Sequence, residues 1–146
     1  MFKRILIPTD GSPISMKAAR AGIALAKALG ARVVGCAIVE ELEPAFRARA
    51  MVSQQMIDDI NAGNRAAGKR QVDKIGRIAA RSGVAFTPVV SRGYRPAEGI
   101  LAVAAKHRCD VVFIATHGHG GFRKLVMGSV ARKVVDQASM PVLVYR

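Results

Sequence analysis

The stretch Asp110–Ser129, DVVFIATHGHGGFRKLVMGS, joins an apolar run to a glycine-rich loop and then to the start of a helix. The run over residues 111–114 is short and continuous, as in a strand that is buried on both faces. The glycines that follow let backbone N–H groups approach a ligand closely, because no Cβ stands in the way. A helix start adds unpaired N–H donors and the positive end of the helix dipole. This order of strand, glycine loop and helix predicts a phosphate-binding site.

The rest of the chain alternates between the same two kinds of element. Continuous aliphatic runs predict strands over residues 3–9, 32–39, 84–90, 110–115 and 141–145. Apolar residues three and four apart predict helices over residues 13–29, 64–81, 96–107 and 129–137. Ser12 is expected to cap the first of these helices and Gly30 to end it. Gly63 and Gly68 weaken a continuous helix, so we expect a broken or mobile connection before residue 64.

Strands that alternate with helices predict an α/β fold, with a parallel sheet covered by helices on both faces. The length favours a single domain over residues 1–146. In doubly wound folds of this kind, ligands bind beyond the carboxyl ends of the strands, where the strand order reverses. Those ends are residues 8–10, residues 38–40 and the loop from Ala115. The local signals therefore converge on one site.

The composition is aliphatic and strongly basic. Hydrophobic residues make up 51% of the chain, and the formal net charge is +13. The basic residues are dispersed, without a run of five or six and without interleaved aromatic residues that would stack on bases. We therefore expect a solvated basic surface that attracts phosphate ligands, and we disfavour nucleic acid as a partner.

The cysteines and the apolar runs indicate a compartment. Cys36 and Cys109 form no Cys-x-x-Cys pair, so we expect buried, reduced thiols rather than a disulfide or a zinc site. The first residues pass directly into a strand, so no signal peptide is expected. No apolar run reaches the roughly 18 residues of a membrane span. These features predict a cytoplasmic protein that does not enter the membrane.

The motifs of several phosphate-handling enzymes are missing. The sequence has no G-x-x-x-x-G-K-[ST] loop and no G-x-G-x-x-G after its first strand. No G-x-S-x-G elbow surrounds Ser129, so this serine is expected to be a phosphate ligand or a helix N-cap and not a nucleophile. His117 and His119 have no evident third ligand, which favours loop residues near a phosphate over a metal site. We expect no catalytic residues and no protein-held metal.

The segment Val142–Tyr145 is apolar and is expected to lie at an edge of the sheet. An exposed apolar edge strand can pair with another chain. We therefore expect a homodimer through this strand. The alternative is a strand that the chain's own helices cover.

Four spaced motifs together resemble the universal stress protein family over the whole chain. They are ILIPTDGS at residues 5–12, RGYRPAEGI at 92–100, the stretch 110–129 and MPVLV at 140–144. The resemblance implies a Rossmann-like, five-stranded sheet with strand order 3-2-1-4-5, as in adenine nucleotide hydrolase-like folds. It also implies the ATP-binding branch of the family, a homodimer through the last strand, and a role as a nucleotide-linked sensor or switch in the stress response.

The resemblance also assigns nucleotide contacts by position. Asp10 would hydrogen-bond the adenosine, which Ile38 or Val39 would contact, and the residues around Gly118 and Gly128 would bind the phosphates of ATP, accompanied by Mg²⁺. The full set that it implies is Pro8, Thr9, Asp10, Ile38, Val39, Ile114, Ala115, Gly118, Gly128, Ser129 and Val130.

One position departs from the family pattern, which has glycine where this chain has Ala115. This departure supports an alternative in which the protein binds no nucleotide and acts through protein or polyanion interactions. From the residues, Asp10 either contacts the ribose or only caps the turn into the first helix. A true nucleotide hydrolase is the third hypothesis, and any ATP hydrolysis is expected to be slow because no positioned general base is evident.

Overall fold

The computed structural model describes residues 1–42, 44–117 and 127–146. Its strands form one sheet in the order β3-β2-β1-β4-β5, and every neighbouring pair is parallel. The strands are β1 (Arg4–Pro8), β2 (Arg32–Val39), β3 (Phe86–Arg92), β4 (Val111–Ala115) and β5 (Val142–Tyr145). The predicted fold class and strand order are confirmed.

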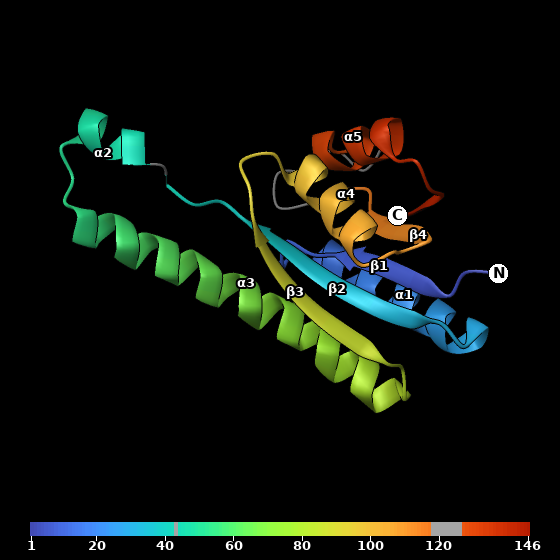
Figure 1. Ribbon diagram of the computed structural model, residues 1–146. Coiled ribbons are helices and arrows are strands. Elements are labelled where there is room, and N and C mark those ends of the chain that lie inside the picture. The colour runs from blue at the N-terminus through green and yellow to red at the C-terminus, as the bar shows by residue number, and fades with distance from the viewer. Residues whose placement is uncertain (43, 118–126) are drawn as a thin grey trace.

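Helices cover both faces of the sheet (Figure 1). The helices are α1 (Pro13–Leu29), α2 (Pro44–Ala50), α3 (Gln54–Ser82), α4 (Pro96–Lys106) and α5 (Ser129–Gln137). Residues of α1 and α3 share one core cluster with one face of the sheet, and residues of α4 and α5 share the other cluster with the opposite face. The sheet is therefore the middle layer of three.

The central strand β1 belongs to both cores. In its register Leu6 lies opposite Val34 of β2 and Val112 of β4. Leu6 faces the α4 and α5 side, whereas Ile5 and Ile7 face the α1 and α3 side, and all three side chains are 0% exposed. The continuous apolar run thus indicated burial on both faces correctly. The edge strand β3 instead exposes much of its surface.

The predicted caps position the first crossover. Ser12 is the N-cap of α1, and its Oγ accepts a hydrogen bond from the backbone N–H of Ser15. Pro13 follows at the first helical position, where its missing N–H costs nothing. Gly30 ends the helix in the left-handed conformation, at φ 63°.

The expectation of a broken connection before residue 64 was wrong from residue 54 onward, because α3 is continuous from Gln54 to Ser82, and the break lies between α2 and α3 at residues 51–53. Ser53 caps its N-terminus by accepting from the N–H of Met56. A Cβ at Gly68 would lie 2.5 Å from Cγ1 of Val39, so glycine is needed here for close packing and does not mark a break. Figure 1 shows the first turns of α3 extending past the end of the sheet, toward α2.

Alanine at the two glycines of α3 separates helix propensity from packing. Gly63→Ala is expected to raise the free energy of unfolding by about 0.5–1 kcal/mol, because a Cβ there meets nothing within 4 Å. Gly68→Ala is expected to lower it by about 1–2 kcal/mol, because the clash with Val39 outweighs the same propensity gain. Urea denaturation of both variants measures the difference. Equal stabilisation by both alanines would contradict the tight contact between α3 and the sheet.

Candidate functional site

A cavity of about 390 Å³ lies at the carboxyl edge of the sheet. Its walls come from the loop after β1, the end of β2, the end of β4 and the first turns of α4 and α5. The volume lies within the range of about 300–1,000 Å³ that is usual for small-molecule sites. The strands β2 and β3 lie on one side of β1, and β4 and β5 lie on the other. The cavity lies between β1 and β4, where the strand order reverses.

The structure brings together most of the residues that the sequence singled out. The cavity is lined by Pro8, Thr9, Asp10, Ile38, Ile114, Ala115, Gly128, Ser129 and Val130. Val39 does not line it, because its side chain contacts Gly68 of α3 on the opposite face of the sheet. Gly118 and His119 lie outside the described residues.

The loop after β1 is held by short polar contacts. The Thr9 Oγ1 accepts from the N–H of Gly11 at 3.0 Å and lies 3.0 Å from the Ser15 Oγ. The Asp10 carboxylate accepts from the N–H of Ser12 at 3.0 Å. Gly11 adopts φ 79°, a conformation that glycine tolerates without a steric penalty. These contacts fix the Asp10 carboxylate at the N-terminus of α1, beside the cavity.

On the opposite wall, α5 begins with backbone groups and not with a side-chain cap. Its N-cap is Gly128, so the interpretation of Ser129 as an N-cap was wrong: Ser129 is the first helical residue. Gly128 has no side chain to cap the helix, and its own N–H donates to the Thr116 carbonyl at 2.7 Å. The first-turn N–H groups of Ser129, Val130 and Ala131 have no partner within the helix, and all three residues line the cavity. This is the donor arrangement that an anion needs.

Several lining residues were missed by the sequence interpretation. They are Ser15, Pro96, Ile100, Thr116 and Ala131. Ser15 and Ala131 lie one turn or less inside helices whose starts were recognised, so helical spacing was the available signal. Pro96 and Ile100 come from α4, whose apolar side gives no sign that part of it faces a cavity.

His117 also lines the cavity. Its Nδ1 lies 2.8 Å from the Thr116 Oγ1, and its Nε2 is buried and has no hydrogen-bond partner among the described residues. Among the described residues no group of three or more His, Cys, Asp or Glu side chains is placed to hold a metal ion. The histidine is therefore a polar wall residue in the part of the chain that the structure describes.

Both cysteines are free thiols and are buried, as predicted. Burial raises the pKa of Cys36 to about 12, with a smaller contribution from Cys109. Burial likewise raises the pKa of Cys109 to about 11. Because the thiolate is the nucleophilic form, neither cysteine is chemically active near neutral pH.

The last strand offers a further candidate contact at the surface of the protein. The strand β5 forms an edge of the sheet, and its four residues are each half-buried. Within the described part of the chain, no helix has the length and apolar character of a membrane span.

Comparison with known proteins gives a family match. A sequence profile of the universal stress protein family matches residues 1–146. The universal stress protein MJ0531 of Methanocaldococcus jannaschii is 32% identical over 146 residues, covering 100% of this chain and 83% of that protein.

Solved structures share the fold. The structure of the hypothetical protein MJ0577 superposes with a TM-score of 0.82 at 21% identity, covering 99% of this chain and 95% of that one. A universal stress protein in complex with cAMP gives a TM-score of 0.68 at 21% identity, covering 99% and 97% of the two chains. A universal stress protein from Archaeoglobus fulgidus in complex with dAMP gives a TM-score of 0.68 at 19% identity, covering 99% of this chain and 98% of that one. At these identities the likeness shows the fold.

Proposed function

This chain belongs to the universal stress protein family, and we propose that it binds ATP, accompanied by Mg²⁺, in the cavity at the carboxyl edge of the sheet. The bound nucleotide would make the protein a sensor or switch in the stress response. Two structural neighbours are described as complexes with cAMP and dAMP, which supports an adenine nucleotide as the ligand class.

The proposal rests on one observation: a single cavity has an apolar wall, a carboxylate and a set of backbone donors that have no partner within their own helix. Ile38, Ile114 and Ile100 supply apolar surface for a base. Asp10 supplies an acceptor for ribose hydroxyls, and the first turn of α5 supplies N–H donors for phosphate oxygens. A nucleotide carries these three kinds of group in the same molecule.

The chemistry of this cavity favours binding over turnover. The Ser129 hydroxyl lies beside the first-turn N–H groups of α5, where it can donate to a phosphate. A magnesium ion bound to the triphosphate would neutralise part of its charge, with the first turn of α5 binding the remaining oxygens. Any hydrolysis would be slow, because the described histidine of the cavity wall, His117, has its Nδ1 engaged with the Thr116 Oγ1 and its Nε2 buried, so neither nitrogen is placed to activate water.

The methyl group of Ala115 is compatible with the proposal. Ala115 is 6% exposed and forms part of the wall, and the cavity keeps its volume of about 390 Å³ beside it. The methyl therefore shapes the wall without filling the space. If the protein had instead lost its nucleotide site, the Ala115 methyl would have to keep ATP out of this cavity.

Two isosteric substitutions test the proposed contacts. Titration of the wild-type protein with MgATP by calorimetry is expected to give a micromolar or lower Kd, about −8 kcal/mol or more favourable. Asp10→Asn keeps an acceptor for the Ser12 N–H but removes the charge, and it is expected to weaken ATP about tenfold. Ser129→Ala removes one hydroxyl donor and is expected to cost about fivefold.

Asp136→Asn and Ser139→Ala are the matched controls, because both residues are exposed and neither lines the cavity. They are expected to bind ATP like the wild-type protein. If wild-type protein ignores millimolar MgATP, or if controls and site variants weaken binding equally, the proposed site is wrong.

We further propose that the protein is a homodimer paired through β5. The carbonyls of Pro141 and Tyr145 accept from the N–H groups of Val112 and Thr116, so these residues face β4. By the alternation of a strand, Val142 and Val144 direct their backbone groups to the outer side. An unpaired edge of this kind pairs readily with a second copy.

Proline at position 144 tests the pairing without breaking the bonds to β4. Val144→Pro removes an outward N–H and is expected to shift the protein to monomer, as measured by light scattering after gel filtration. Val144→Thr retains the N–H and a β-branched side chain, and it is expected to stay dimeric. A Val144→Pro protein that dimerises as strongly as the threonine variant would rule out pairing through this edge.

The compartment that we propose is the cytoplasm. It is supported by the two buried cysteines, which are free thiols, as is usual where the environment is reducing.

A further inference from the structure

The basic residues are dispersed along the sequence, but the fold gathers many of them on one layer. Helix α1 carries three cations and no carboxylate. Residues 64–82 of α3 carry six cations and one carboxylate, Asp73. These two helices lie together on one face of the sheet. The sequence interpretation disfavoured nucleic acid because the charges are dispersed along the chain and no aromatic residues are interleaved with them, and neither observation shows where the fold places the charges.

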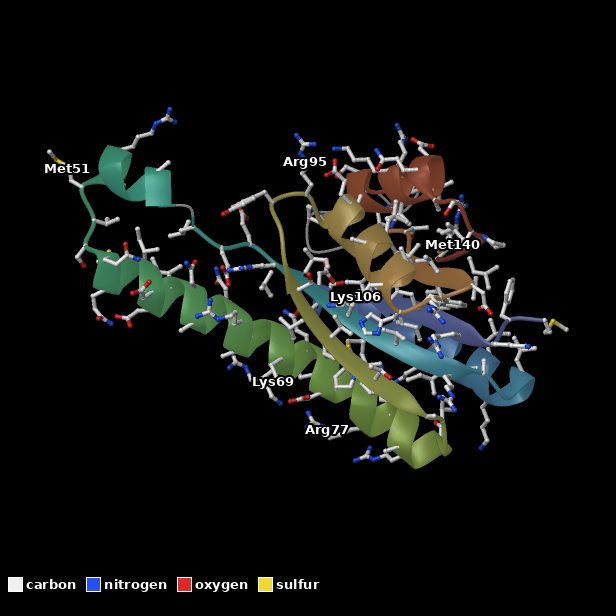
Figure 2. The ribbon with its side chains drawn as sticks, viewed as in Figure 1. Met51, Lys69, Arg77, Arg95, Lys106 and Met140 are labelled. Carbon is white, nitrogen blue, oxygen red and sulfur yellow. The ribbon has the colours of Figure 1, made fainter. Side chains whose placement is uncertain are left out.

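The cations of α3 lie on the flank that faces α1 and on the adjoining outer side of the helix. The Gln71 side chain lies against Gly11, and Ile78 packs in the core cluster that α1 shares, so this flank is turned toward α1. Lys74 and Arg81 follow these two residues by three positions and therefore lie beside them at the helix surface. The row on α3 is Arg70, Lys74, Arg77 and Arg81, of which Arg70 and Arg77 lie on the outer side of the helix, opposite the buried Val72 and Ile75. Figure 2 shows Arg77 extending from α3 into solvent.

The cations of α1 lie on the flank that faces α3. Gly22 is packed against Phe113 of β4, so its side of the helix faces β4. At 100° per residue, Arg20 and Lys27 fall on the other flank, next to Met16 and Ile23, which pack in the cluster shared with α3. The row on α1 is Lys17, Arg20 and Lys27. The two rows thus border the surface between the helices.

All seven side chains in the two rows are exposed, and none forms an ion pair with any residue that the structure describes. The other cations of α3 differ in this respect. Lys69 pairs with Asp73 at 2.8 Å, and Arg65 pairs with Glu41 at 2.6 Å on the flank away from α1. The hydrogen bond from Arg65 lowers the pKa of Glu41. The two rows therefore hold charge that the protein itself does not neutralise.

We propose that the two rows, called here the α1/α3 basic face, bind the phosphate backbone of double-helical nucleic acid. The rows are about 15 Å and about 16 Å long, at roughly 1.5 Å per residue. Packed helices lie about 8–10 Å apart, which is between the widths of the minor groove, about 6 Å, and of the major groove, about 12 Å, so long cationic side chains from the two rows can contact phosphates on both sides of a groove. Between the two rows lie partly buried residues such as Met16, Gln71 and Ile78, so the exposed cations are the groups that contact a backbone, and the face reads no sequence.

Other polyanions fit the face less well. A membrane-surface helix needs large apolar side chains that enter the lipid, and the large hydrophobic residues exposed in the described structure all lie outside α1 and outside residues 64–82. Single strands are bound by aromatic side chains that stack on bases, and residues 13–29 and 64–82 include none. The face therefore matches a duplex, whose charges lie on its surface and whose bases are already stacked.

Binding to a fluorescent DNA duplex of about 24 base pairs tests the proposal, with no nucleotide added. The wild-type affinity is expected to fall steeply between about 50 and 200 mM salt, with a log–log slope of about −4 to −6. The variant Lys74→Glu/Arg77→Glu/Arg81→Glu is expected to bind at least 30-fold more weakly and to lose about three units of that slope. The variant with glutamine at the same three positions removes the positive charges without adding negative ones. Its affinity for the duplex is expected to lie between those of the wild type and the glutamate variant.

The control is Lys3→Glu/Lys106→Glu/Arg132→Glu, which changes the net charge equally at exposed positions elsewhere. It is expected to stay within about threefold of wild type, and circular dichroism confirms that each variant is folded. Equal losses in the two glutamate variants would overturn the proposal, since net charge alone would then explain the binding. Wild-type protein that ignores the duplex at about 50 mM salt, or that binds anionic phospholipid vesicles or a thymidine single strand more tightly, would also overturn it.

Discussion

The cavity depends on one constraint, which is that parallel strands must be joined by crossover connections. In this sheet the crossovers place strands on both sides of β1. The chain passes from β1 to β2 and β3 on one side and then to β4 and β5 on the other. The loops that leave β1 and β4 therefore diverge, and the space between their ends is the cavity. Burial of Ile5, Leu6 and Ile7 at 0% exposure holds β1 in the centre, so the core of the protein also fixes the position of the site.

Much of this arrangement could be predicted from local sequence. Apolar runs identified the strands, and the caps Ser12 and Gly30 identified the ends of α1, because each depends on neighbouring residues alone. The length of α3 could not be predicted, because Gly68 normally weakens a helix. Here glycine is needed for close packing against Val39, which is distant in the sequence. For the same reason the sequence alone could not show that Ile38, and not Val39, lines the cavity. Nor could it show that Gly128, and not Ser129, is the N-cap of α5.

Two different uses of positive charge emerge from the structure. At the start of α5 the charge is partial and fixed, since it comes from backbone N–H groups that point at one place. On the α1/α3 basic face the charge is full and is spread over seven exposed side chains. The first suits one phosphate group held in a defined position, and the second suits a repeating polyanion. The net charge of +13 reveals neither, because it carries no information about position.

Backbone amide mapping by NMR during titration with MgATP would locate the bound nucleotide. We expect saturable shifts at Gly11 and at Ser129, Val130 and Ala131, while the amide signals of the basic rows of α1 and α3 do not shift. Shifts confined to α1 and α3 would show that ATP is bound only as a polyanion on the basic face. That result, or a spectrum unchanged at millimolar MgATP, would contradict a nucleotide site at the carboxyl edge of the sheet.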